Sequence, residues 1–559
     1  MRVLGVNALF HDPSAALVID GQPVAAAEEE RFSRRKHGKR PVPFAAWEQP
    51  EQAMRWCLQQ AGLQPQDLDA VAYSFDPSLA RPAEEMGMND PWDHLRRTYA
   101  ERAPQFIAAA LPGLDPEQVR FVPHHVAHAA SGALASPHLS SATLVLDGRG
   151  EHASHLGGRY TGGRLEVLAS QDLPHSLGLL YESLTEHLGF LRSSDEYKVM
   201  ALASYGRPTH LEELRETIYA TDDGGFVAPI PDWDRWAPPR VDDGTWGGEH
   251  ADLACSVQAR LEEVLVDLAT WLYEQTGERV LTMAGGTALN CVANSRIWRE
   301  TPFEDVWVQP AAGDAGTSLG AALQACADGG DEPQPMPSAA LGRGWSDDEL
   351  AARLRGAAVP FTTPDDLAAE VADILAHNGV VGWFEGRSEY GPRALGQRSL
   401  LANPAYAENL ERLNDVKGRE QFRPVAPMVL LDRAAEIFSG GPIPSPYMLF
   451  VHEVAPQWRD RIPAAVHVDG TARIQTVDAA TQPRLGATLE AFAARTGLPV
   501  VINTSLNTAG RPMVDDPRDA LELFGSAPVD ALVVGPHLVR RAHVFSPAAE
   551  VSATVGAAT

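Results

Sequence analysis

The chain has 559 residues, of which 44% are hydrophobic and 21% charged, and its formal net charge at pH 7 is −28. One hydrophobic core rarely organises a chain of this length, so two or three domains are expected. The acidic balance argues against a protein that binds nucleic acid, because such binding depends on an excess of Lys and Arg at the phosphates.

Cysteine usage and hydropathy restrict the compartment. The four cysteines form no CxxC pair, which excludes a cysteine zinc module and favours a reducing, cytoplasmic location; they are Cys57, Cys255, Cys291 and Cys326. No run approaches ~18 uninterrupted apolar residues, so no membrane span is expected. His11 and Asp12 interrupt the first apolar run, which therefore predicts a strand and not a signal peptide.

Two segments repeat one pattern of strands. Residues 3–21 and 143–157 each give an apolar strand, a turn of small and polar residues, and a second strand. A third strand follows each segment, at 23–27 and at 165–169. This duplication predicts an α/β (α+β) chain whose first domain is actin-like, with two halves that grip a nucleotide. It is an analogy of fold, and function has to come from site residues.

Two histidines in this region predict a metal site. His124 and His128 lie four residues apart, so a helix would place both rings on one face. Asp147 ends an apolar run, and Asp314 stands in a glycine-rich turn. Two imidazoles and two carboxylates suit Fe(II) or Mn(II) better than a closed zinc site, and Mg(II) is a further alternative. Packing is the competing explanation of the histidine pair.

Glycine-rich turns near these residues predict nucleotide contacts. Residues 280–290 give a strand, a Gly-Gly turn and the start of a helix, and glycines flank Asp314. Without side chains, such turns let backbone N–H groups approach adenosine or phosphate closely. The predicted contacts are Gly285, Gly286, Thr287, Asn290, Gly313 and Gly316.

Residues 221–250 and 252–275 differ in pattern. The second segment repeats apolar residues at helical spacing and is expected to be a long packing helix that Gly277 ends. The first is rich in Asp, Gly, Pro and Trp and predicts a long loop. Asp232, Trp233, Asp234 and Trp236 could contact a hydroxylated or cationic acceptor, with a structural insertion as the alternative.

Residues 328–340 form a Pro/Gly/acidic linker, after which a dense cationic cluster appears. Strands are expected at 380–384 and 499–503, and a helix at 485–494. Arginine forks and lysines match phosphate oxygens, and Asn503 and Ser505 could orient a planar ligand. Ion pairing with local glutamates is the alternative. The predicted ligand-binding cations are Arg393, Arg398, Lys417, Arg423 and Arg473.

Taken together, these motifs resemble the nodulation-type O-carbamoyltransferase family over nearly the whole chain. The layout is most similar to that of its antibiotic-tailoring, tobramycin-type members. The segments that carry the resemblance are FHDPSAA (10–16), EEERFSRRKH (28–37), HHVAH (124–128), DEYKVMALA (195–203), GGTALN (285–290), GPRALG (391–396), FRPVAP (422–427) and NTSLN (503–507).

The resemblance implies a fold and a reaction. It implies an actin-like domain at 1–327, the linker at 328–340, a YrdC-like domain at 341–547 and a flexible tail at 548–559. Carbamoyl phosphate and ATP would form carbamoyl-adenylate in the second domain. The first domain would then transfer the carbamoyl group to a hydroxyl of a small natural product, an antibiotic by likeness. The oligomeric state is left open.

Three side chains are assigned to catalysis. His11 lies in the first phosphate turn and is the predicted general base for the acceptor hydroxyl, with a structural role as the alternative. Lys36 and Lys198 lie within two of the family-like motifs. The competing functions are threonylcarbamoyl transfer to tRNA, which the net charge disfavours, and a nucleotide-switched binding protein without catalysis.

Overall fold

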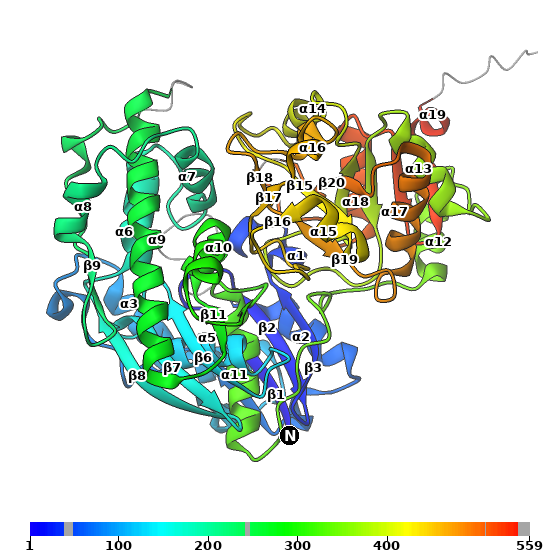
Figure 1. Ribbon diagram of the computed structural model, residues 1–559. Helices are drawn as coiled ribbons and strands as arrows, with labels where there is room; N and C mark the ends of the chain where they lie inside the picture. The colour runs from blue at the N-terminus through cyan, green and yellow to red at the C-terminus, as the bar shows by residue number, and fades with distance from the viewer. Residues whose placement is uncertain (39–48, 241–245, 509, 546–559) are drawn as a thin grey trace, which may run out of the picture.

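The computed structural model describes residues 1–38, 49–240, 246–508 and 510–545. Its N-terminal part, coloured blue to green in Figure 1, contains two five-stranded sheets. The first sheet has the order β3-β2-β1-β4-β5. Its strands are β1 (Arg2–Asn7), β2 (Ser14–Ile19), β3 (Gln22–Glu28), β4 (Ala70–Tyr73) and β5 (Val119–Phe121).

The second sheet repeats the first strand by strand. Its order is β12-β11-β6-β7-β8, with β6 (Ser140–Leu146), β7 (Ala153–Thr161), β8 (Arg164–Asp172), β11 (Val280–Ala284) and β12 (Asp305–Val308). In each sheet, the three strands that come first in the chain are antiparallel neighbours. The other two strands pair in parallel on the free side of the earliest strand, β1 or β6. The predicted duplication of the strand unit is therefore confirmed in topology.

Two helices, α5 (His124–Ala133) and α11 (Ala315–Asp328), pack against each other beside these sheets. A Cβ at Gly320 of α11 would lie 1.8 Å from the carbonyl oxygen of Ala127, so only glycine permits this approach. The packing brings the first residues of α5 and of α11 together. The chain thereby joins the histidine pair to Asp314, although about 190 residues separate them.

Among the remaining helices of this part, α2 (Glu51–Gln60) and α9 (Gly248–Thr276) contact the sheets, and α7 (Glu196–Ala203), α8 (Leu211–Thr217) and α10 (Cys291–Glu300) pack on α9. The long helix α9 ends at Gly277, whose φ is 62°, as predicted. The others are α1 (Glu30–Ser33), α3 (Asp93–Glu101), α4 (Ala103–Ala110) and α6 (Leu177–His187). Two short strands, β9 (Tyr219–Ala220) and β10 (Phe226–Val227), form a separate hairpin.

The C-terminal part, yellow to red in Figure 1, is built on one mixed seven-stranded sheet. Its order is β19-β15-β20-β14-β13-β21-β22, with β13 (Val381–Phe384), β14 (Arg398–Ala402), β15 (Ala426–Leu430), β19 (Gln475–Val477), β20 (Val500–Ser505), β21 (Ala531–Val534) and β22 (His537–Arg540). A small sheet adds β16 (Phe438–Ser439), β17 (His452–Val454) and β18 (Thr471–Ala472). The strands predicted at 380–384 and 499–503 are confirmed.

Helices flank this larger sheet, and the predicted helix at 485–494 lies within α17 (Pro483–Thr496). The others are α12 (Asp347–Gly356), α13 (Leu367–Ala376), α14 (Asn409–Lys417), α15 (Ala434–Ile437), α16 (Pro456–Arg459), α18 (Pro517–Ser526) and α19 (Arg541–Val544). No helix in the described part of the chain combines the length and apolar character needed to cross a bilayer.

The segment between α11 and α12 lies on the N-terminal part of the molecule. The backbone N–H groups of Gln334 and Met336 donate to the carbonyls of Gly21 and Ala135, at 2.9 and 3.0 Å. Further on, the carbonyl of Leu341 accepts a hydrogen bond from the N–H of Ala26 in β3. The predicted linker therefore contacts the first sheet. The predicted tail, 548–559, lies outside the described residues.

Candidate active site

Four buried side chains form a compact group where α5, the end of β6 and the start of α11 meet. They are His124, His128, Asp147 and Asp314, and their donor atoms all lie within 4.8 Å of one another. The Nε2 atom of His124 lies 3.3 Å from Asp147 Oδ2, and Nε2 of His128 lies 3.5 Å from Asp314 Oδ1. A metal bound at about 2.1 Å holds neighbouring donors roughly 3–3.5 Å apart, so the spacing fits one ion.

The surroundings of this group also fit a divalent cation. His124 Nδ1 donates to the carbonyl of Ser74 at 3.2 Å, which leaves its Nε2 lone pair directed at the carboxylates. Both ring nitrogens of His128 and both carboxylate oxygens of Asp314 are buried without a hydrogen-bond partner among the described residues. Burial lowers the pKa of His124, but Asp147 and Asp314 outweigh it and raise the pKa well above its usual value. The group therefore demands positive charge.

His11 and Asp12 stand beside this group on the turn between β1 and β2. His11 Nδ1 lies 2.9 Å from Asp12 Oδ2, and His11 Nε2 lies 3.7 Å from Asp314 Oδ2. Burial lowers the pKa of His11, but Asp314 and Asp12 outweigh it and raise the pKa to about 10. Without a metal these carboxylates favour the protonated imidazole, and the role of His11 as general base stays a prediction.

A second cluster is cationic and comes from the C-terminal part. Arg393, Lys417, Arg419, Arg423 and Arg473 line one wall of a cavity. Burial and the nearby Arg473 lower the pKa of Arg393 to about 9, and burial and Arg423 do the same for Arg419. Burial also lowers the pKa of Lys417 well below its usual value. These shifts show that buried positive charges repel one another without enough counter-charge, as expected of a site for an anion.

Neutral oxygen atoms complete this cluster. The Nζ atom of Lys417 donates to the carbonyl and hydroxyl oxygens of Ser505, at 2.6 and 2.9 Å, and to the side chain of Asn507 at 2.6 Å. The Nε atoms of Arg393 and Arg473 are buried with no hydrogen-bond partner among the described residues. Guanidinium N–H groups left in this way match phosphate or carboxylate oxygens.

One cavity of about 1770 Å³ joins the two groups. Asp147, Asp314 and His11 line it in the N-terminal part, and the cationic cluster lines it in the C-terminal part. Direct contacts bridge its sides: Gly391 N donates to Glu28 at 2.7 Å, and Lys198 Nζ lies 2.9 Å from Glu420. The arrangement can hold a metal and an anion in one shared cavity.

Comparison with known proteins identifies the class. The family model described as Carbamoyltransferase N-terminus matches residues 2–228 and 235–323, and that described as Carbamoyltransferase C-terminus matches 372–541. The chain belongs to the carbamoyltransferase family. The group of His124, His128, Asp147 and Asp314, called the metal-ligand group below, lies in the first matched region. The cationic cluster lies in the second.

Relatives agree over most of the chain. Nodulation protein NolNO of Sinorhizobium fredii is 37% identical, covering 96% of this chain and 80% of that protein. Nodulation protein U of Bradyrhizobium diazoefficiens is 31% identical, covering 93% and 95%. Among solved structures, the activator of the 2-hydroxyisocaproyl-CoA dehydratase from Clostridium difficile is similar at 12% identity and a TM-score of 0.33. The match covers 59% of this chain and 95% of the activator.

Three predicted ligand contacts of this carbamoyltransferase lie outside the cavity lining. Arg398 is fully buried and does not line the cavity; it donates to the carbonyls of Arg343, Glu385 and Gly386 and stacks on Phe384. Its charge therefore stabilises the fold. Gly285 and Gly316 do not line the cavity either, and both allow close packing of the backbone. A Cβ on either would lie 2.2 or 2.1 Å from a backbone oxygen.

The other predicted ligand contacts do line the cavity. They are Gly286, Thr287, Asn290, Gly313, Arg393, Lys417, Arg423, Arg473, Asn503 and Ser505. Lys36 and Lys198 line it too. Lys198 is engaged by Asp195 and Glu420, at 3.0 and 2.9 Å, so it links the two parts of the molecule.

The loop predicted to bind the acceptor belongs to the core instead. Trp233 is buried and donates to Ser183 at 3.0 Å, and Trp236 donates to Glu213 at 2.8 Å. Both rings pack against the hydrophobic cluster around α9. No described residue of 221–250 lines the cavity, and 241–245 lie outside the described residues. The structural alternative, an insertion that extends the core, therefore accounts for the described part.

Three residues of the site were not singled out from the sequence. Asn507 ends the quoted NTSLN motif, and Arg419 stands between the predicted contacts Lys417 and Arg423, so a count of cations and amides there would have included both. His37 ends the second motif and reaches the cavity. Its partners come from two other segments of the chain, so no local spacing could have identified it.

Proposed function

We propose that this carbamoyltransferase joins carbamoyl phosphate and ATP at the cationic cluster and transfers the carbamoyl group to an alcohol near the metal-ligand group. The observation that carries the proposal is the single cavity that connects a group demanding a cation with a cluster demanding an anion. A carbamate is a weak electrophile, and an adenylate supplies the leaving group that it lacks. One water would first hydrolyse carbamoyl phosphate to carbamate and phosphate, and a carbamate oxygen would then bond to the α-phosphorus of ATP as the bond to pyrophosphate breaks.

The roles of residues follow from charge. Arg393, Arg423 and Arg473 would hold the phosphates of ATP and carbamoyl phosphate, and Lys417 would add a point charge. Enclosure would keep water from the reactive anhydride between the two steps. We infer that the seven-stranded C-terminal part, taken as 341–547, acts as a YrdC-like activating domain, and that 1–327 acts as the transfer domain.

His124, His128, Asp147 and Asp314 would hold the metal. We propose Fe(II), with Mn(II) or Mg(II) as alternatives, because imidazole and carboxylate donors suit these ions. Bound there, the ion would act as a Lewis acid toward phosphate or carbonyl oxygens. The surrounding side chains exclude water and fix the donors in place.

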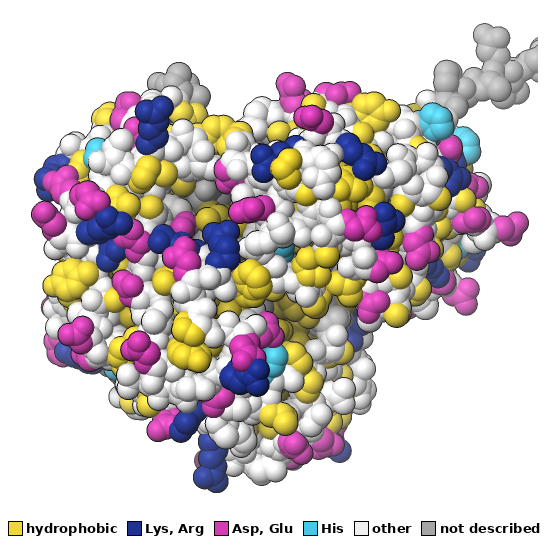
Figure 2. Space-filling model, in the orientation of Figure 1, with side chains coloured by type: hydrophobic (Ala, Val, Ile, Leu, Met, Phe, Trp, Pro, Cys, Tyr) yellow, Lys and Arg dark blue, Asp and Glu magenta, His cyan; other side chains and the backbone are white. Residues whose placement is uncertain are grey.

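We propose a small natural product, such as an antibiotic, as the alcohol, and a cytoplasmic location consistent with four free cysteines. Figure 2 shows Lys and Arg interspersed with Asp and Glu over the visible face, without a continuous basic band. That distribution does not favour tRNA as the acceptor. Membership of a transferase family leaves no reason to retain the non-catalytic alternative.

Two measurements test the proposal. Pyrophosphate release from ATP should depend on carbamoyl phosphate. Incubation with both substrates and a panel of aminoglycoside, macrolide and ansamycin alcohols should give one product heavier by a carbamoyl group. Pyrophosphate release that is equal with and without carbamoyl phosphate would contradict the adenylate route.

A further inference from the structure

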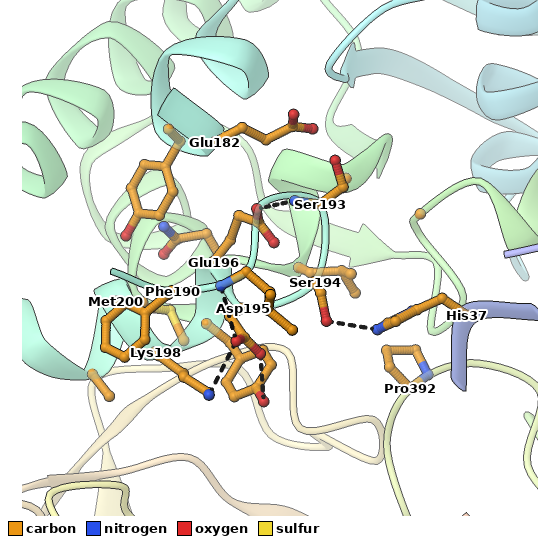
Figure 3. A pocket seen from close by; sticks show the side chains of 18 of the residues that line it. His37, Glu182, Phe190, Ser193, Ser194, Asp195, Glu196, Lys198, Met200 and Pro392 are labelled. Atoms are coloured by element: carbon orange, nitrogen blue, oxygen red, sulfur yellow. Dashed lines mark hydrogen bonds and ion pairs between the residues drawn. The ribbon is translucent and has the colours of Figure 1, made fainter. Parts of the chain in front are cut away.

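Three side chains from separate segments form a hydrogen-bonded chain on the cavity wall. His37 Nδ1 lies 2.8 Å from Asp12 Oδ1, and His37 Nε2 lies 2.9 Å from the hydroxyl of Ser194. Figure 3 shows the Ser194 hydroxyl directed at the His37 ring, with a dashed line joining the two. All three residues line it, and the His37 and Asp12 side chains are 28% and 25% exposed.

The carboxylate fixes which nitrogen of His37 carries the proton. Asp12 can only accept, so Nδ1–H of His37 donates to it, and Nε2 keeps the lone pair. The Ser194 hydroxyl donates to that lone pair. A carboxylate that orients an imidazole, whose outer nitrogen takes a hydroxyl proton, is the arrangement that activates alcohols in acyl transfer.

The backbone holds this arrangement at a cost in strain. Asp12, His37 and Ser193 have φ values of 48°, 59° and 57°, in the left-handed region that non-glycine residues rarely adopt. Asp12 and His37 belong to the hydrogen-bonded chain, and Ser193 directly precedes its third member, Ser194. The His37 N–H also donates to Glu30 at 2.7 Å. Left-handed non-glycine residues are often found at functional sites.

We propose that His37, oriented by Asp12, is the catalytic base of carbamoyl transfer, and that the Ser194 hydroxyl occupies the place of the acceptor hydroxyl. His11 shares the same carboxylate, but its Nε2 faces Asp314, whereas the Nε2 of His37 faces a hydroxyl and the cavity. The role rests on the proposed function, because it assumes carbamoyl-adenylate as the donor.

The step balances without a further reagent. The acceptor oxygen forms a bond to the carbamoyl carbon as its proton moves to Nε2 of His37. The bond between that carbon and the bridging oxygen of AMP breaks, and AMP leaves with the electron pair. His37 then returns its proton to solvent.

The pH dependence has a defined sign. The charged groups that face His37 are Asp12 on the β1–β2 turn, Glu30 on α1 and the adjacent Lys36. Burial lowers the pKa of His37, but Asp12 outweighs it and raises the pKa. The base is active only when neutral, so alcohol transfer falls as pH falls through this raised pKa.

The test compares two nucleophiles in the full-length protein loaded with metal, ATP and carbamoyl phosphate. Glycerol needs a base, whereas hydroxylamine already carries a free electron pair at neutral pH. His37→Gln should lower carbamoyl-glycerol formation about 100-fold or more, remove the acidic limb of its pH profile and leave hydroxyurea formation near the wild-type rate. His152→Gln is the matched control. His152 Nδ1 lies 2.9 Å from Asp172 Oδ1, a similar pair, and neither residue lines the cavity.

Ser194→Ala separates this role from a serine nucleophile. If Ser194 only marks the acceptor position, its loss lowers glycerol transfer less than about tenfold, far less than His37→Gln. Equal losses in both variants, or glycerol transfer by His37→Gln at the wild-type rate, overturn the proposal. A wild type that converts hydroxylamine but no alcohol also overturns it. A wild type that converts neither nucleophile contradicts the proposed function instead.

Discussion

At the N-terminal end of the cavity, two carboxylates and two imidazoles crowd together with no cation, whereas at the other end four arginines and a lysine gather with too few anions. The first group raises the pKa of His124, and the second lowers the pKa values of Arg393, Lys417 and Arg419. Each end therefore has the charge that a bound ligand would neutralise. The contrast divides the work, since a metal would bind at one end and phosphate groups at the other.

The largest expected effect comes from the metal end. His128→Ala removes one of four donors, so we expect loss of bound metal and of carbamoyl transfer, while pyrophosphate release dependent on carbamoyl phosphate continues. Metal content and both rates are measured on the same preparation. His125→Gln is the control, because His125 lies on the same helix outside the group. Full transfer by metal-free His128→Ala would contradict the assignment.

At the cationic end, a substitution is expected to lower pyrophosphate release that depends on carbamoyl phosphate. Lys417→Ala should lower kcat/KM for carbamoyl-dependent pyrophosphate release by about 30- to 1,000-fold, equivalent to about 2–4 kcal/mol. Arg484→Ala serves as the control, because Arg484 pairs with Glu385 and Asp347 and does not line the cavity. Equal rates for Lys417→Ala and the wild type would place activation elsewhere.

One arginine should affect stability and not ligand binding. Arg398→Met leaves several backbone carbonyls without a donor, so the free energy of unfolding should fall by about 3–5 kcal/mol. Denaturant titration measures this change. Properly folded Arg398→Met should keep its KM for ATP, and a large rise in that KM would return Arg398 to the ligand site.

The smallest effect concerns a carboxyl group between the two ends. Burial and Glu182 raise the pKa of Glu196 to about 7 from a model-peptide value of 4.5. The native state then binds more protons than the unfolded state, so stability is lost as pH rises from about 4.5 to 7. Glu196→Gln should be more stable than the wild type at pH 8, by at most about 3 kcal/mol, and equal to it at pH 4. Glu84→Gln, at an exposed position, should show no such difference.

Much of the fold could be predicted from local pattern. Alternating apolar strands around two polar turns gave both copies of the N-terminal unit, and helical spacing together with Gly277 gave α9. The pairing of His124 with His128 could be predicted, because one helix places both rings on the same face. Asp147 and Asp314 were predicted as ligands only because they are carboxylates in glycine-rich turns. The packing of α5 on α11 brings the histidines and Asp314 together.

Other features depended on tertiary contacts that no local pattern records. Arg398 reads like its neighbours Arg393 and Arg423, but its position in β14 turns it toward backbone carbonyls. Trp233 and Trp236 looked like ligand contacts because their segment lacks periodicity, and the core around α9 absorbs them. His37 acquires its role from Asp12 and Ser194, which lie 25 and 157 residues away.

The central claim is that one enclosed cavity serves both steps within one molecule, and a mixing experiment tests it most directly. On this account His128→Ala should still form carbamoyl-adenylate, and Lys417→Ala should keep the transfer end. Both variants are incubated together with ATP, carbamoyl phosphate and the accepted alcohol. We predict no more carbamoylated product than either variant gives alone, because the intermediate stays inside the molecule that made it. Recovery of transfer in the mixture would show that the intermediate crosses through solvent and would contradict the account.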